Sequence, residues 1–191
     1  MRLTTFELPR VIRFGAHNTR RNLPAASASK RGESNFLAQF ERAYFAQETS
    51  LSGHEFAAGR EFGLDGFGRA DVLWIAWKKT PDSSDFSALA LSKRIHVTAV
   101  EAKLKDWRKG LQQASRYRYF ANRALLVLPP DTARIALGFL ETFRSLNVGL
   151  WEFDAATERI IKHTTPRVRR PLNERAREKA IDIIHRHLDL G

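Results

Sequence analysis

The sequence predicts an α/β fold in which a mixed β-sheet is flanked by helices. Two observations lead to this prediction. Apolar stretches of strand length alternate with stretches of helical periodicity along most of the chain. The chain has 191 residues, 43% of them hydrophobic, which suits one domain with a substantial core. The pattern shows no internal repeat.

The first elements follow from spacing and capping residues. Apolar side chains recur at helical spacing between Phe36 and Phe45, and Ser34 or Asn35 can cap the helix that they predict. In chain order we expect an irregular or extended segment over 1–32 with a small-residue linker at 24–29, a helix to about Gln47, a strand near 55–63 and a Gly-rich turn over 63–68.

The remaining elements alternate between strand and helix. Pro129 and Pro130 end one apolar strand and start the helix that follows it. In order we expect strands over 69–77 and 94–103, a helix from about Trp107 to Asn122, a strand over 124–128, a helix to about Leu146, strands over 148–153 and 158–163, and a helix over 172–189.

Two of these strands carry charges that folding alone does not require. Asp71 lies near the start of the strand over 69–77, and Glu101 and Lys103 lie near the end of the strand over 94–103. Glu101 and Lys103 are two residues apart and therefore project from the same side of their strand. Burial of an ion is costly unless it is paired, hydrogen-bonded or bound to a metal. The alternative is an ordinary salt bridge at a strand end.

An antiparallel pairing of these two strands brings the charges together. If Asp71 lies opposite Glu101, the same register sets Trp77 against Ile95 and leaves residues 78–94, which begin with loop composition, as the connection. Two converging carboxylates suit a hard divalent cation such as Mg²⁺ or Mn²⁺. Such a cation polarises phosphoryl oxygens and lowers the pKa of bound water, and a neighbouring lysine can act on that water.

This arrangement resembles the PD-(D/E)xK superfamily of restriction-endonuclease-like nucleases. The resemblance covers about residues 33–153 and implies a core of helix, three-stranded meander, helix and strand, with extra C-terminal strands and a helix here. By resemblance, Asp71 and Glu101 are metal ligands and Lys103 acts on the attacking water. The chain departs from the family pattern at Ala70, where the family has proline, and in the long interval between Asp71 and Glu101.

The helix after these strands extends the resemblance. Gln113 and Tyr117 are four residues apart and share a helix face, as in the branch that includes RecB-type and Cas4-type nucleases. In related nucleases these positions support the site or touch the substrate backbone. Gln113 borders the predicted inner stripe, whereas Gln112 points away from it. The alternative is a glutamine and a tyrosine at an ordinary helix–sheet boundary.

The first helix is expected to supply a further acid, because the superfamily often places one there. Glu41 lies one turn after Leu37 and one turn before Phe45, which puts it at the edge of the apolar face. We therefore rank Glu41 first, Glu33 second and Glu48 as a further possibility. The alternative is that all three are solvated helix charges.

Charge favours a nucleic-acid partner. The formal net charge is +11, and residues 1–31 contain seven Arg or Lys against one acid. Basic surfaces of this kind attract phosphates without reading sequence. Trp107 could stack on a base or pack in the core. The predicted nucleic-acid-binding residues are Arg69, Lys105, Trp107, Lys109, Arg116, Arg167, Arg169 and Arg170.

Three parts are expected in the chain. These are a basic N-terminal extension over 1–32, the nuclease-like core over 33–165 and a basic C-terminal helical segment over 166–191 that packs on the same domain. The chain contains no cysteine, which excludes disulfides, thiolate zinc sites and cysteine-held iron–sulfur clusters. No apolar run reaches the length of a membrane span, so a cytoplasmic location is expected.

These observations predict a metal-dependent nuclease that hydrolyses phosphodiester bonds, with DNA as the favoured substrate. Two alternatives stay open: a nucleic-acid-binding or regulatory protein on the same scaffold that does not cleave, and a nuclease subunit that acts only with a separate partner. A homodimer is compatible with the sequence. The sequence does not decide between DNA and RNA or between endo- and exonuclease action.

Overall fold

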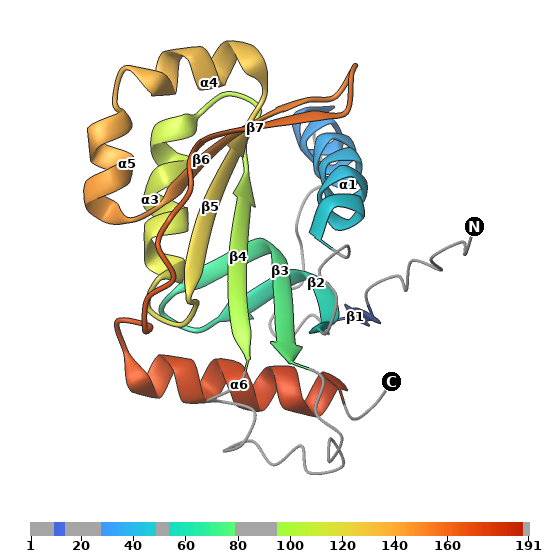
Figure 1. The fold of residues 1–191 in the computed structure, drawn as a ribbon, viewed down its shortest axis with the longest axis vertical. Coiled ribbons are helices and arrows are strands. Elements are labelled where there is room, and N and C mark those ends of the chain that lie inside the picture. Colours follow the sequence, from blue (N-terminus) through green and yellow to red (C-terminus); the bar gives the residue numbers. More distant parts are fainter. Residues whose placement is uncertain (1–9, 14–27, 49–53, 79–94, 189–191) are drawn as a thin grey trace.

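The computed structural model describes residues 10–13, 28–48, 54–78 and 95–188. Within these residues, seven strands form one sheet in the order β1-β2-β3-β4-β5-β6-β7. The protein therefore has an α/β fold with a mixed sheet, as the sequence predicts (Figure 1). The strands are β1 (Arg10–Arg13), β2 (His54–Leu64), β3 (Gly68–Lys78), β4 (His96–Ala102), β5 (Arg123–Leu128), β6 (Gly149–Asp154) and β7 (Arg159–Thr164).

The sheet combines an antiparallel meander with parallel strands. β2, β3 and β4 pair antiparallel in sequence order. β4 pairs in parallel with β5, and β5 in parallel with β6, while β7 returns antiparallel to β6. β1 adds to the free edge of β2 in parallel. The described helices are α1 (Ala28–Glu48), α3 (Trp107–Tyr117), α4 (Pro130–Leu137), α5 (Leu140–Leu146) and α6 (Glu174–Leu188).

The pairing of β3 with β4 has the register that the sequence predicts. The paired residues run from Val72 opposite Val100 to Ala76 opposite His96. Continued by one residue at each end, the same register sets Asp71 opposite Glu101 and Trp77 opposite Ile95. A shift of one residue would move every side chain of the strand to the other face, so this agreement fixes which charges share a face.

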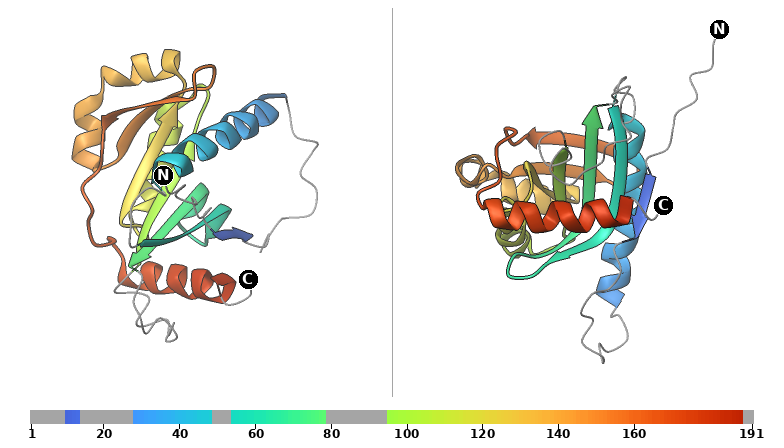
Figure 2. Two further views of the ribbon diagram at one scale, coloured as in Figure 1. Left: turned by 45° about the vertical axis from the view of Figure 1, so that its right-hand side comes forward. Right: turned by 90° about the horizontal axis from the view of Figure 1, so that it is seen from below.

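Helices cover both faces of the sheet. α1 lies on one face, where Phe36, Phe40 and Tyr44 pack on apolar side chains that include Val72 and Trp151. On the other face, side chains of α3 and α6 pack against alternate residues of β3, β4 and β5. Figure 1 shows α1 on one side of the sheet and α3, α4 and α5 on the other, and Figure 2 shows α6 lying across one end.

Three element boundaries differ from the predictions. α1 begins at Ala28 and not at Ser34, because the residues before Ser34 include Ala, Lys, Arg and Glu, which form helix well. α3 ends at Tyr117, and turns follow it to residue 120. The single helix expected up to Leu146 is two helices, α4 and α5, which are separated by Gly138 and Phe139.

Part of the predicted organisation lies outside the described residues. This holds for most of the basic extension over 1–32 and for residues 79–94 of the predicted connection. Residues 10–13, expected to be irregular or extended, form the edge strand β1, and the end of the expected linker at 24–29 belongs to α1. Within the described residues, no helix is both long enough and apolar enough to cross a membrane.

Candidate active site

The two motif strands carry their charges on the face that α3 covers. Asp71 has the same parity as Leu73 and Ile75, which belong to the core under α3, and Glu101 follows Val97 and Ala99 on the same face of β4. The apolar rows of both strands thus end in carboxylates that lie side by side. Strand alternation, with the register described above, is sufficient to bring these two acids together.

Glu101 is the most deeply buried charge of the site. Its side chain is 1% exposed, and Lys103 Nζ lies 2.6 Å from Glu101 Oε1. Asp71 is fixed against the same strand, because its Oδ2 accepts a hydrogen bond of 2.8 Å from the backbone N–H of Ala102. Asp71, Glu101 and Lys103 therefore form one cluster.

α3 contacts this cluster through the side chain of Tyr117. The Tyr117 side chain is fully buried, and its hydroxyl group donates to the backbone carbonyl of Arg69 at 2.6 Å. The same hydroxyl group contacts Glu101 Oε2 through a short hydrogen bond. Tyr117 therefore ties the first residues of β3 to the carboxylate on β4.

A glycine allows α3 to lie this close to the sheet. A Cβ atom on Gly110 would lie 2.6 Å from Leu126 Cδ1 and 2.9 Å from Lys103 Cγ. Both distances are shorter than real carbon contacts, so a larger residue here would force Leu126 or Lys103 to shift. Lys103 is held in turn by its backbone N–H, which donates to the Val127 carbonyl at 3.1 Å. The contact of Gly110 with Lys103 joins two elements and could not be predicted from the sequence.

Gln113 lies at the border of the buried face, as predicted, whereas Gln112 is exposed. The Oε1 atom of Gln113 is buried and has no hydrogen-bond partner among the described residues. An unpaired buried carbonyl oxygen is costly. A donor from a ligand would satisfy it, which fits a supporting role for Gln113.

Burial and mutual repulsion raise the pKa values of the two acids of this cluster. Burial, followed by the negative charge of Asp71, raises the pKa of Glu101 to about 7, although Lys103 and Tyr117 act in the opposite direction. Burial also raises the pKa of Asp71, against the opposing effects of the Ala102 N–H and of Lys103. Burial lowers the pKa of Lys103, but the hydrogen bond and charge of Glu101 outweigh it and raise that pKa overall.

The acid that α1 brings toward this cluster is Glu33. Its negative charge acts on the pKa values of both Asp71 and Lys103. The first turns of α1 reach the end of β4, since the Cβ position of Gly32 lies 3.2 Å from Leu104 Cδ1. Glu33 is half-buried there. Among the glutamates of α1, the second-ranked Glu33 is thus the one whose charge acts on the cluster.

Glu41, the first-ranked glutamate, has a different partner. It is 7% exposed and accepts a hydrogen bond of 2.6 Å from Arg60 Nε on β2, with a second contact from the same guanidinium group. The prediction that Glu41 joins the catalytic group is corrected accordingly, because α1 crosses the sheet so that only its first turns lie at the end of β4. The Glu48 side chain lies outside the described part of the chain.

The predicted nucleic-acid-binding residues separate into two groups. Trp107 is 6% exposed and packs on Phe139 and Phe143, at ring distances of 4.9 and 6.0 Å. The prediction that Trp107 stacks on a base is therefore wrong, because the ring belongs to the core between α3 and α5. The basic residues of the set are all exposed: Arg69, Lys105, Lys109, Arg116, Arg167, Arg169 and Arg170.

The residues present fit a divalent cation. Among the described residues, no group of three or more His, Asp and Glu side chains is arranged as a metal cage. Mg²⁺ does not require one, because it is usually held by one or two carboxylates together with waters and substrate phosphates. Asp71 and Glu101 supply two adjacent oxygen donors whose mutual repulsion a cation would relieve. They are the residues that would hold Mg²⁺ or Mn²⁺.

Comparison with known proteins adds no further assignment. No protein-family model matches the chain, and no curated protein sequence is significantly similar to it. The functional interpretation therefore depends on the cluster of Asp71, Glu101 and Lys103 itself.

The raised pKa of Glu101 predicts a pH-dependent stability. In the folded protein Glu101 binds its proton up to about pH 7, whereas the unfolded chain releases it near 4.5. The stabilising contribution is present at low pH and is lost as the pH rises through this window. In EDTA, urea unfolding should show the free energy falling by about 3 kcal/mol from this group between about pH 5 and 8.

The control for this prediction is Glu101→Gln, which cannot titrate. The difference between wild type and this variant isolates Glu101 from other titrating groups, such as His96. The prediction fails if both proteins show the same pH slope.

A second prediction concerns the contact of α3 with the lysine. Gly110→Ala should lower the free energy of unfolding by about 1–3 kcal/mol, because the methyl group overlaps Leu126 and Lys103. The matched control is Gly138→Ala, whose methyl group would meet only Ile135 O, at 3.5 Å. That variant should be neutral or slightly stabilising in the same urea titration. Equal effects of the two substitutions would contradict the close packing at Gly110.

Proposed function

We propose that the protein is a metal-dependent nuclease that hydrolyses phosphodiester bonds in DNA. The observation that carries this proposal is the gathering of Asp71, Glu101 and Lys103 at adjoining strand ends, with Lys103 Nζ 2.6 Å from Glu101 Oε1. A folding argument gives no reason to bury these three charges together. Phosphodiester hydrolysis supplies one, since it needs a cation site and a positive group beside it.

The order of elements supports the restriction-endonuclease-like fold as part of this proposal. α1 is followed by the antiparallel meander β2-β3-β4, then by α3 and by β5, which pairs in parallel with β4. This is the order that the resemblance implies. β6, β7 and α6 are then the additional C-terminal elements.

Each residue of the cluster has a distinct part in the proposed mechanism. A cation bound to Asp71 and Glu101 would supply Lewis acidity toward the scissile phosphate and its attacking water. Tyr117 orients Glu101, and the Ala102 N–H orients Asp71. Lys103 keeps its proton at neutral pH, because its pKa is raised. Its role is therefore to orient the water and to stabilise the negative charge of the transition state.

The cost of the cluster argues against a protein that only binds nucleic acid. A buried carboxylate beside a second carboxylate destabilises the fold unless a cation or proton compensates it. A binding protein gains nothing from that cost, because exposed basic residues are sufficient to attract phosphates.

Cleavage assays test this proposal. Wild-type protein should cleave DNA in Mg²⁺ or Mn²⁺, tested on supercoiled, linear and single-stranded substrates. Asp71→Ala, Glu101→Gln and Lys103→Met should each lower the rate by about 100-fold or more, because each removes a group that acts on the reacting phosphate or water. Asp65→Ala and Lys179→Ala, which replace exposed charges elsewhere, should cleave like wild type.

Two outcomes would contradict the proposal. Activity that survives the three site substitutions would show that the chemistry lies elsewhere or comes from a contaminant. DNA binding without divalent metal, combined with no cleavage of any substrate, would favour the non-cleaving alternative.

A further inference from the structure

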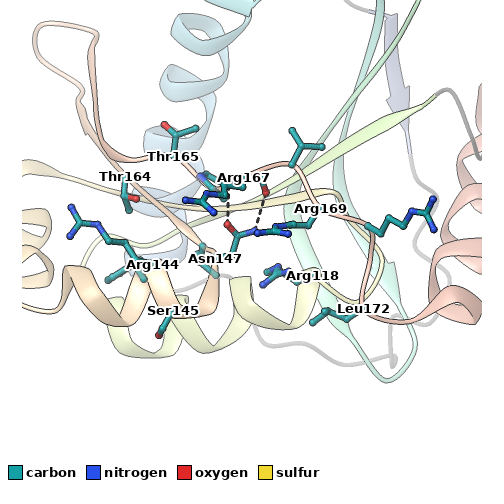
Figure 3. Close-up of a pocket in the computed structure, with 14 residues that line it drawn as sticks. Arg118, Arg144, Ser145, Asn147, Thr164, Thr165, Arg167, Arg169 and Leu172 are labelled. Atoms are coloured by element: carbon teal, nitrogen blue, oxygen red, sulfur yellow. Dashed lines mark hydrogen bonds between the residues drawn. The ribbon is translucent and has the colours of Figure 1, made fainter.

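A second recess lies away from the carboxylate cluster and shares no residue with it. Its volume is about 1010 Å³, and Figure 3 shows side chains that reach it from Arg118 just after α3, from α5 and its turn into β6, and from the end of β7 and the chain that follows it. We call it the arginine cavity. Its lining residues are Arg118, Phe143, Arg144, Ser145, Asn147, Val148, Thr164, Thr165, Pro166, Arg167, Val168, Arg169, Arg170 and Leu172.

The cavity concentrates positive charge without a matching negative charge. Five of its lining residues are arginines, and none is an aspartate or glutamate. Arg144 pairs with the exposed Glu141 on its own helix. Within the described part of the chain, the guanidinium groups of Arg167, Arg169 and Arg170 have no carboxylate partner. Burial, together with the positive charge of Arg169, lowers the pKa of Arg118.

Hydrogen bonds hold the arginine-bearing segment in place. Asn147, in the left-handed conformation at the end of α5, accepts from the Arg167 N–H and donates to the Arg167 carbonyl, both at 2.9 Å. Asn122 binds the backbone of Arg169 on both sides, at 3.2 and 3.3 Å. The Leu172 N–H donates to the Arg118 carbonyl at 2.9 Å. The backbone that carries these arginines is therefore held in place before binding, which reduces the entropy lost on binding.

The chemistry of the lining identifies the kind of ligand. Guanidinium groups bind phosphate through paired hydrogen bonds. Val148, Val168 and Leu172 add apolar wall, and Ser145 and Thr165 add hydroxyl groups. A phosphate next to a sugar and a flat apolar base would match all three kinds of surface. The volume also falls at the upper end of the range of small-molecule sites, about 300–1,000 Å³.

We propose that the arginine cavity binds the phosphate of a nucleotide. This nucleotide belongs to a nucleic-acid strand, which the cavity holds at a second point away from the carboxylate cluster. The naming of a strand as the source rests on the proposed function, whereas the binding of a nucleotide phosphate does not. The cavity thus combines two sets of arginines. The sequence predicted nucleic-acid contacts for Arg167, Arg169 and Arg170. It did not indicate Arg118 and Arg144.

Binding measured in EDTA tests this proposal without any cleavage. Fluorescence anisotropy would follow a labelled single-stranded oligonucleotide with either a 5′-phosphate or a 5′-hydroxyl group, and a nucleoside 5′-monophosphate and inorganic phosphate would be added as competitors. The double variant Arg167→Gln/Arg169→Gln should bind about tenfold or more weakly than wild type, with a shallower salt dependence. Both side chains are exposed, so the variant should fold normally.

The matched control is Arg134→Gln/Arg186→Gln, which removes the same net charge from exposed positions on α4 and α6. This control should change the affinity by less than about threefold. Equal losses in the two double variants would overturn the proposal, since net charge alone would then explain binding. Displacement by the free nucleotide would identify it as the ligand, whereas displacement only by oligonucleotides would identify a strand.

This experiment separates the two proposals. Asp71→Ala keeps every residue of the arginine cavity and should bind in EDTA at least as tightly as wild type, because it removes a negative charge that repels phosphate, even though its cleavage rate should fall by about 100-fold or more. Loss of cleavage without loss of binding would test the role of the carboxylate cluster alone. Loss of binding in the Arg167→Gln/Arg169→Gln variant alone would test the role of the arginine cavity.

Discussion

A buried carboxylate, Glu101, is the constraint on which the rest of the site depends. Its side chain is almost completely excluded from water, and a second acid, Asp71, lies beside it on the neighbouring strand. Removal of an ionised carboxylate from water costs several kcal/mol unless other charges compensate. Lys103 compensates part of this cost, and the raised pKa of Glu101 shows that a part is left. A divalent cation would supply the missing positive charge.

The surrounding fold is built to keep these groups together. The antiparallel register aligns the two acids, Tyr117 connects β3 to Glu101 through its hydroxyl group, and Gly110 allows α3 to lie against the stem of Lys103. Helices pack against both faces of the sheet at these strands. Rigid placement matters because a cation site and a water-orienting lysine act only when their spacing is kept.

Much of this arrangement could be predicted from residue patterns. The register that sets Asp71 opposite Glu101 could be proposed from the sequence, because it also places the loop composition after Lys78 in the connection, and β3 and β4 pair in that register. The choice between Glu33 and Glu41 did not, because it depends on how α1 crosses the sheet. Helical spacing could not show whether Trp107 faces solvent or core. The arginine cavity could not be predicted from the sequence either, since Arg118 and Arg169 are brought together only by tertiary contacts.

The central claim is that Asp71 and Glu101 share one cation, and a double-mutant cycle on Mn²⁺ affinity tests it most directly. Calorimetry without nucleic acid would compare wild type, Asp71→Asn, Glu101→Gln and the double variant. Each single substitution should weaken binding by at least about tenfold, and the double variant should be little weaker than the singles, because ligands of one ion are strongly coupled. Unchanged Mn²⁺ affinity in the single variants, or fully additive losses in the double variant, would contradict a shared ion.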